Sequence, residues 1–417
     1  MEKRNRLHYA WFILAAVCII VGLGKSVINS SGSLFLDPVS KDLGIGMGDL
    51  TLYLSIGSVV TLLILPFIGK IFGKYDARLV IAIAIVLQAG CFAAFGFMDS
   101  VWGWYILAIP MAFGGVPIMV ICGPVLINRW FKKSSGMALG IMGATGGLIG
   151  AIATPIIGSL IANAGWRQTY TWVGLVVIAI VVPIALLVIR SNPQNKGLKR
   201  YGEDEGSGTQ TTQVELVGMT LASAKKTPAF MLLLLFFFMI TAVSCFAIHI
   251  PSYLQNNGYT VEFAGVAMSG YSIGLLVGSL GFGYLTDKIG AKIATIIAMS
   301  CGLASIVLLL LFTNVTAIVI FAVSIFGFIS ASIATLAPAV TGALFGNKEY
   351  SQIYSSASLG LAVASIAALP AYGYILDFTG SYKPALITVI ALLVLTIICI
   401  IFAFRSKEKL VSAGQWK

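Results

Sequence analysis

Lys25 is a basic residue in the middle of a long apolar segment near the start of the chain. It precedes Asp37 by twelve residues, which is about 18 Å along a helix and therefore close to the middle of a bilayer. An ionisable side chain at that depth costs about 2.5–3.5 kcal/mol, so its presence favours a functional role, here the binding of an anion. Asn29 lies one helical turn later on the same face and could hold a substrate oxygen. The alternative is that Lys25 extends its ammonium group toward the interface or pairs with backbone carbonyl groups.

Three more side chains are candidates for a polar site. His249 could titrate near neutral pH and carry a proton, or it could be a hydrogen-bonded polar residue of an outer gate. Tyr53 and Tyr271 could line a binding cavity or anchor the chain at the membrane interface. The sequence contains no nucleophile–base pair and no metal-ligand spacing, so we expect no catalytic site, no metal and no cofactor. The six cysteines all fall in apolar segments, and we interpret them as packing residues.

The elements that must position these residues are membrane-spanning helices. The chain is 59% hydrophobic and 10% charged, whereas roughly 25% of the residues in a soluble domain are charged. Apolar runs long enough to span a bilayer recur along the whole sequence. This pattern predicts an all-α polytopic membrane protein with twelve transmembrane helices, at about 9–38, 50–71, 77–98, 103–130, 135–162, 167–190, 229–256, 262–285, 291–312, 315–345, 351–376 and 382–405.

The net charge of +11 does not indicate a nucleic-acid surface, because the positions of the basic residues relative to the membrane explain it. Lys41, Arg167 and Lys383 are the only Lys or Arg residues expected in external loops, and nearly all the others fall on the opposite side. This positive-inside distribution predicts a multi-pass protein with both termini cytoplasmic. We expect it in the cytoplasmic membrane of a prokaryotic cell. The lipid bilayer is therefore an expected partner, and nucleic acid is not.

The two halves of the chain repeat each other at an offset of 214 residues. The repeat predicts two pseudo-symmetric six-helix bundles, at 1–190 and 229–405. They are joined by a cytoplasmic linker at 191–228 with a short interfacial helix, and a cytoplasmic tail follows at 406–417. Duplicated apolar halves are typical of secondary transporters, whose substrate site lies between the repeats near the middle of the membrane. The matching pairs are Gly44 with Gly258, Gly69 with Gly283, Lys74 with Lys288, and Arg78 with Lys292.

A motif between the eighth and ninth predicted helices contains Gly283, Asp287, Lys288, Gly290 and Lys292. It resembles the cytoplasmic loop of the major facilitator superfamily. The resemblance covers the whole chain and implies the twelve-helix major facilitator fold. We expect the motif to act as a cytoplasmic gate, because its Asp can meet a helix N-terminus or a basic partner.

The first copy of the motif is degraded. It keeps Gly69, Lys74 and Arg78, but Gly73 replaces the Asp and Asp76 replaces the later Gly.

Four further motifs lie along the chain: Leu36-Asp37-Pro38-Val39, Asn128-Arg129-Trp130-Phe131, Gly165-Trp166-Arg167 and Thr227-Pro228-Ala229-Phe230. Together they resemble the monocarboxylate porters, and within them the bacterial oxalate–formate antiporter branch. The resemblance implies a small organic anion as substrate. The chain departs from that branch where the family's anion-binding residues are expected: Ser279 replaces an Arg, Val120 replaces a Tyr, and the eleventh helix has no basic residue.

We therefore expect a monomeric secondary transporter of a small organic anion, working by alternating access with protons or a counter-anion. No P-loop signature is present, so ATP is not expected to drive the cycle. The alternative is a proton-coupled exporter of amphipathic or drug-like compounds. Such an exporter usually needs a carboxylate within the membrane, and Asp37, Glu262 and Asp377 all lie near predicted helix ends.

Overall fold

Helices dominate the computed structural model, which describes residues 8–132, 134–203, 218–346 and 348–412. The chain divides into two units. Unit 1 comprises Met1–Leu43 and Ile56–Gln210, and unit 2 comprises Gly44–Ser55 and Thr211–Lys417. The first turns of α3 (Met47–Lys74) therefore group with unit 2, although most of this helix belongs to unit 1.

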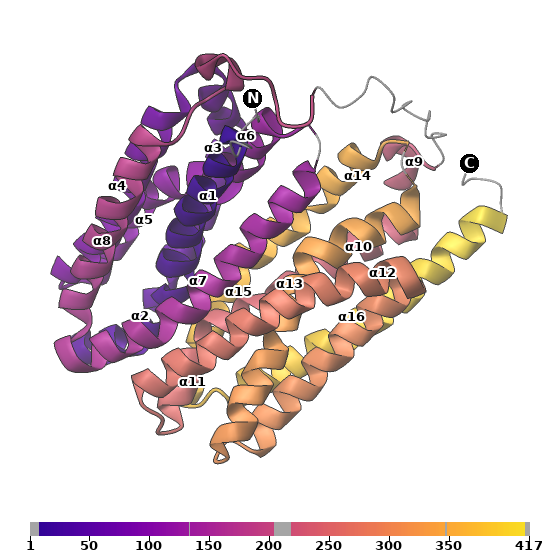
Figure 1. Ribbon diagram of the computed structural model, residues 1–417. Coiled ribbons are helices and arrows are strands. Elements are labelled where there is room, and N and C mark those ends of the chain that lie inside the picture. Colours follow the sequence, from indigo (N-terminus) through magenta and orange to yellow (C-terminus); the bar gives the residue numbers. More distant parts are fainter. Residues whose placement is uncertain (1–7, 133, 204–217, 347, 413–417) are drawn as a thin grey trace. The chain divides into compact units, whose positions relative to one another are not determined.

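In unit 1, α4 packs against both α5 and α8, and α7 packs against the first helices of the chain (Figure 1). Its core is aromatic, with the rings of Phe35 and Tyr170 stacked 3.8 Å apart. The elements besides α3 are α1 (Tyr9–Val21), η1 (Gly22–Ser30), α2 (Ser31–Leu43), α4 (Ala77–Ala94), η2 (Phe95–Phe97), α5 (Val101–Val116), η3 (Pro117–Cys122), α6 (Gly123–Trp130), α7 (Ser135–Ala164), α8 (Trp166–Leu187) and η4 (Pro193–Lys196).

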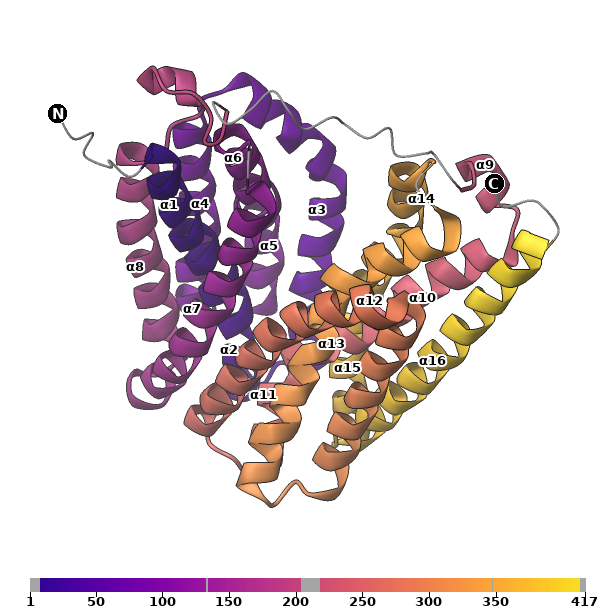
Figure 2. The ribbon, with the colours of Figure 1, turned by 45° about the vertical axis from the view of Figure 1, so that its right-hand side comes forward.

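In unit 2, α10 packs against α13, α15 and α16, while α12 packs against α13 and α16 (Figure 2). The central position of α10 explains why its Phe236 and Phe237 are fully buried. The elements besides the start of α3 are α9 (Leu221–Ala224), α10 (Pro228–Cys245), η5 (Phe246–His249), α11 (Ile250–Asn256), α12 (Val261–Leu311), α13 (Thr316–Phe345), α14 (Tyr350–Ala357), α15 (Leu359–Thr379) and α16 (Lys383–Ser412).

Among the described residues, eleven helical stretches are long and apolar enough to cross a membrane. One of them, α12, has 51 residues, more than twice the roughly 20 that a helix needs to cross a bilayer. It breaks at Gly290, where φ is 81° and ψ is 158°. Gly165, which separates α7 from α8, has nearly the same conformation, with φ 80° and ψ 161°. The break divides α12 into two spans, so the twelve predicted helices are all accounted for.

We expect Gly290→Ala to destabilise the protein by about 1–3 kcal/mol, because only glycine tolerates this backbone conformation. A Cβ at Gly290 would meet no atom within 4 Å, so the cost is strain in the backbone alone. Gly281→Ala is the matched control, since Gly281 lies in the helical part of α12 and has the same open surroundings. Thermal unfolding of the purified variants measures both, and equal midpoints would contradict the expectation.

Two predicted segments differ in detail from the structure. The first helical stretch continues to Leu43, five residues beyond the predicted end, and an ion pair of 2.8 Å between Asp37 and Lys41 spans its last turns. A helix of only four residues, α9, lies where the linker helix was predicted, and its position at the membrane interface stays a prediction. Residues 204–217 of the linker and 413–417 of the tail lie outside the described residues, and the predicted division at 190, 228 and 405 stays a prediction.

Candidate functional site

Lys25 lies on η1, a π-helical segment that joins α1 to α2. Two glycines let this segment approach its neighbours closely. A Cβ at Gly24 would come within 2.5 Å of Ile118 in η3, and one at Gly22 within 2.3 Å of Ile149 in α7. Short π-helical stretches inside membrane helices are frequent at functional sites. The sequence of this segment thus fixes both its close packing and the position of Lys25.

Gln88 of α4 holds the π-helical segment from the side. Its Nε2 donates a hydrogen bond of 2.8 Å to the Gly24 carbonyl oxygen. In a π-helix the backbone hydrogen bonds join residues five apart and not four apart, which changes the partners of the carbonyl groups. The side-chain amide of Gln88 supplies a donor to one of these carbonyl groups. Gln88 is fully buried, and its Oε1 has no partner among the described residues. The residue directly before Lys25 is therefore fixed by a side chain that sequence reasoning did not find.

Lys25 and Asn29 share an exposed face of η1, as their spacing predicted. Lys25 forms no ion pair or hydrogen bond with any described residue. Asp37, an acidic residue on the same helical stretch, is instead paired with Lys41. The site therefore presents an uncompensated ammonium group beside an amide. This pair can bind a carboxylate through charge-assisted hydrogen bonds.

His249 is fully buried in unit 2, and both of its ring nitrogens are engaged. Nε2 lies 2.8 Å from the Leu369 carbonyl oxygen and Nδ1 lies 3.2 Å from the Tyr382 hydroxyl. A carbonyl oxygen can only accept, so Nε2 carries the hydrogen and Nδ1 accepts from Tyr382. This geometry is that of the hydrogen-bonded polar residue, one of the two interpretations that the sequence left open.

The two candidate tyrosines have different surroundings, and both lie in unit 2. Tyr53, in the first turns of α3, is buried. Tyr271 of α12 is partly buried and donates a hydrogen bond to Ser330 Oγ of α13. Their predicted contact with substrate stays a prediction, as does that of Lys25 and Asn29.

The second copy of the predicted gate motif surrounds the break in α12. Gly283, Asp287 and Lys288 lie in the last turns before Gly290, and Lys292 lies in the first turn after it. Asp287 and Lys288 are exposed, and Asp287 forms no ion pair with another described residue. The role of this motif as a gate stays a prediction.

The first copy forms a local network, although its sequence is degraded. Gly69 and the exposed Lys74 lie in the last turns of α3, and Arg78 lies in the first turn of α4. Asp76 caps α4 by accepting a 3.0 Å hydrogen bond from the Arg78 backbone. The substitution of Asp for the later Gly of the motif thus supplies an N-cap, which stabilises the start of α4.

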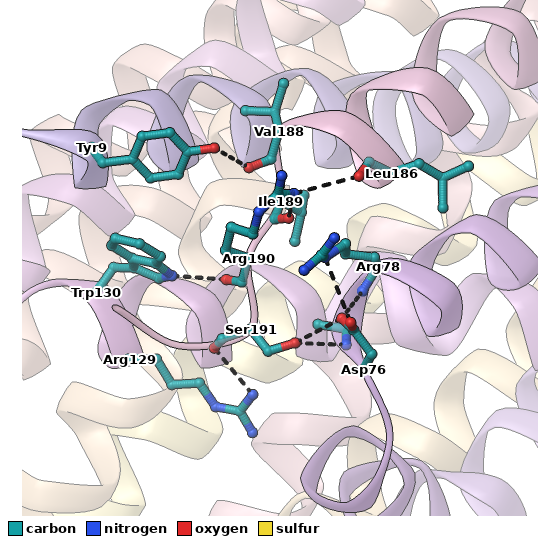
Figure 3. A network of polar contacts seen from close by, with 11 residues as sticks. Tyr9, Asp76, Arg78, Arg129, Trp130, Leu186, Val188, Ile189, Arg190 and Ser191 are labelled. Atoms are coloured by element: carbon teal, nitrogen blue, oxygen red, sulfur yellow. Dashed lines mark hydrogen bonds and ion pairs between the residues drawn. The ribbon is translucent and has the colours of Figure 1, made fainter. Parts of the chain in front are cut away.

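Asp76 also connects α4 to the chain that follows α8 (Figure 3). Ser191 Oγ donates a 2.9 Å hydrogen bond to Asp76, and Trp130 donates one of 2.9 Å to the Arg190 carbonyl oxygen. Partial burial raises the pKa of Asp76, but the hydrogen bonds from Arg78 and Ser191 and the charges of Arg78 and Arg190 outweigh it. The pKa of this carboxyl is therefore held below its ordinary value, and the network is complete at neutral pH.

A carboxylate that sequence reasoning left without a role caps α3. The two oxygens of Asp377, in the last turn of α15, accept hydrogen bonds of 2.8 Å from the Met47 backbone and 2.7 Å from the Gly48 backbone. A negative charge at a helix N-terminus is stabilised by the helix dipole. Gly48 is needed here, because a Cβ would lie 2.3 Å from the ring of Tyr374. The only sequence signal was an acidic residue at a helix end.

A proline explains a second contact between these elements. Pro370 lies inside α15 and has no N–H group to donate to the carbonyl oxygen of Ile366, four residues earlier. Ser55 Oγ of α3 donates a hydrogen bond of 2.7 Å to that carbonyl oxygen instead. The first turns of α3 are thus bound to α15 at both ends of the segment Gly44–Ser55.

Comparison with known proteins identifies the family. A family model described as the Major Facilitator Superfamily matches residues 12–264 and 232–415. The chain belongs to the Major Facilitator Superfamily. The crystal structure of a bacterial homolog to the human lysosomal transporter Spinster has the same fold. It has a TM-score of 0.71 at 15% identity and covers 98% of this chain and 99% of the other. The predicted all-α major facilitator fold is confirmed.

Relatives within the superfamily differ in what they carry. The riboflavin transporter RibJ of Trypanosoma cruzi (strain CL Brener) is 28% identical over 194 residues, which are 45% of this chain and 41% of RibJ. The oxalate:formate antiporter of Oxalobacter formigenes is 26% identical over 196 residues, 47% of this chain and 45% of the antiporter. The chain thus matches less than half the length of either relative. The antiporter is the kind of relative that the finer sequence resemblance predicted.

Proposed function

We propose that this membrane transporter carries a small organic anion, a mono- or dicarboxylate, by alternating access coupled to protons or to a counter-anion. The supporting observation is Lys25, an exposed ammonium group near the middle of its helical stretch with no ion pair among the described residues. A cation kept at that depth is costly unless it has a use, and an anionic substrate would offset its charge. The similarity to an oxalate:formate antiporter agrees with this chemistry.

The exporter alternative is supported less well. Two of the acidic residues at the ends of membrane helices already have partners: Asp37 pairs with Lys41, and Asp377 caps α3. A proton-coupled exporter needs a carboxylate that can take up and release a proton near the compound bound in the middle of the membrane. A carboxylate held by such partners at a helix end is poorly placed for this. We therefore favour an anionic substrate and a net movement of charge that a proton or a second anion offsets.

We expect purified protein in liposomes to take up a radiolabelled carboxylate when an inward proton gradient or a preloaded counter-anion is supplied. Formate, acetate and oxalate are the first probes, and each gradient is imposed separately. ATP without a gradient should leave uptake at the level of protein-free liposomes. If a sodium gradient alone drove uptake, or if no carboxylate were carried under any gradient, this proposal would have to be abandoned.

A further inference from the structure

A group of uncharged polar side chains lies near the middle of four membrane helices in unit 2. We call it the hydroxyl cluster. Each member lies close to the centre of its span, at the depth where transporters of this architecture bind substrate. Its members are Thr241, Ser244 and Cys245 on α10, Tyr271 on α12, Ser330 on α13 and Ser365 on α15.

Contacts between side chains join the members of the cluster. Tyr271 donates a hydrogen bond to Ser330 Oγ, and the Cys245 side chain lies beside that of Ser365. Cys245 also lies close enough to Tyr271 for the two groups to interact electrostatically. Thr241 precedes Cys245 by one helical turn and so lies on the same face of α10. The four helices therefore bring their polar groups to one place.

Two hydroxyl groups of the cluster have no partner. Thr241 Oγ1 and Ser244 Oγ are buried without a hydrogen bond to any described residue, and Thr241 as a whole is only 6% exposed. A buried hydroxyl without a partner costs free energy. The usual solution in a membrane helix is a bond to the carbonyl oxygen four residues earlier. Ser272 and Thr335, on α12 and α13, both adopt it, whereas Thr241 and Ser244 do not.

Interhelical packing explains only part of the cluster. Hydrogen bonds between hydroxyl groups hold membrane helices together, and the Tyr271–Ser330 pair could serve that purpose alone. The unpartnered hydroxyls of Thr241 and Ser244 hold nothing together. They can donate to or accept from a molecule that enters. None of the six residues is charged, so the cluster offers a buried carboxylate no opposite charge, and an uncharged hydrogen-bonding group suits it better.

We propose, building on the anion transport inferred above, that the hydroxyl cluster binds an uncharged hydroxyl, carbonyl or amide group of the transported molecule. The substrate is then a monoanion that also carries a neutral hydrogen-bonding group. A second carboxylate placed in this cluster would be removed from water without a positive partner, so dicarboxylates are disfavoured.

Matched series of ligands test this directly. The probes are terminal hydroxycarboxylates, from hydroxyacetate to hydroxyhexanoate, each compared with the plain carboxylate and the dicarboxylate of the same chain length. Apparent affinities come from thermal stabilisation of the purified chain. For at least one chain length, we expect the hydroxy acid to bind at least about tenfold more tightly than the plain carboxylate or the dicarboxylate. The plain carboxylate leaves the buried hydroxyl groups of the cluster unpaired, and the dicarboxylate places a charge there without a positive partner.

Variants assign the preference to the cluster. In Tyr271→Phe and Thr241→Val, which each remove a hydroxyl and little volume, the preference should fall to about twofold or less. Ser272→Ala is the matched control, because its hydroxyl is already bonded to the Met268 carbonyl oxygen, and it should keep the full preference. Ser244→Ala replaces Thr241→Val if the latter lowers the unfolding midpoint of the free protein.

The outcomes separate this inference from the function on which it rests. If hydroxylated and plain carboxylates bind equally well and both need Lys25, anion transport stands and the role of the cluster is overturned. Tighter binding of dicarboxylates than of hydroxy acids also overturns it. If terminal diols bind through Tyr271 while no carboxylate binds at all, the cluster is upheld and anion transport is overturned.

Discussion

Lys25→Met should reduce the uptake and the binding of carboxylates by about 100-fold or more. Removing one member of a desolvated charge pair typically costs 2–5 kcal/mol, and about 3 kcal/mol corresponds to that factor. Methionine keeps much of the apolar length of the lysine side chain, so the packing of η1 against α7 should survive. Uptake into liposomes measures the loss, and the unfolding midpoint of the purified variant verifies the fold.

Lys41→Met is the matched control for this change. Lys41 lies on the same helical stretch, but its side chain is 64% exposed and is paired with Asp37, so the substitution should leave uptake close to wild type. Lys25→Arg keeps the charge but places a planar fork where a compact ammonium group was, and we expect a partial loss. Wild-type transport by Lys25→Met would show that Lys25 serves the structure and does not bind the substrate.

His249→Leu should lower the free energy of unfolding by about 1–3 kcal/mol. Leucine nearly fills the space of the imidazole but removes the hydrogen bonds that the imidazole makes with the Tyr382 hydroxyl and the Leu369 carbonyl oxygen. Each such hydrogen bond contributes about 0.5–1.5 kcal/mol. The midpoint of thermal or denaturant unfolding of the purified protein measures the change.

His249→Gln separates a structural role from proton coupling. A glutamine amide can donate to Leu369 and accept from Tyr382, but it cannot titrate. We expect this variant to regain most of the lost stability and to keep proton-driven uptake. A stable His249→Gln protein that responds only to a counter-anion would instead make His249 the proton carrier, which was the other interpretation of the sequence.

The membrane helices and Lys25 could be predicted because they depend on local properties. Apolar length identifies a span without any knowledge of its neighbours, and one charge in such a run is conspicuous. The position of Gly290 was also visible, since it lies in a recognisable motif. The division between the helices at 262–285 and 291–312 was predicted as well, but that Gly290 makes it without a loop followed only from its backbone angles.

The supporting contacts could not be predicted, because they join residues far apart in the chain. His249 meets partners 120 and 133 residues away, and Asp377 caps a helix that begins 330 residues earlier. No periodicity encodes such pairings. The π-helical form of η1 was also hidden, since Gly22 and Gly24 suggest close packing but not a change in the hydrogen-bond pattern.

The one-residue turns at Gly165 and Gly290 have a consequence for how the protein is made. Each leaves no loop between two apolar helices, so the charged residues beside the turn are shared by both helices of the pair: Arg167 at Gly165, and Asp287, Lys288 and Lys292 at Gly290. The two helices of a pair therefore cannot set their orientations independently during synthesis. We expect each pair, α7 with α8 and the two arms of α12, to enter the bilayer together as a preformed helical hairpin. The orientation of two spans would then be decided in a single insertion event.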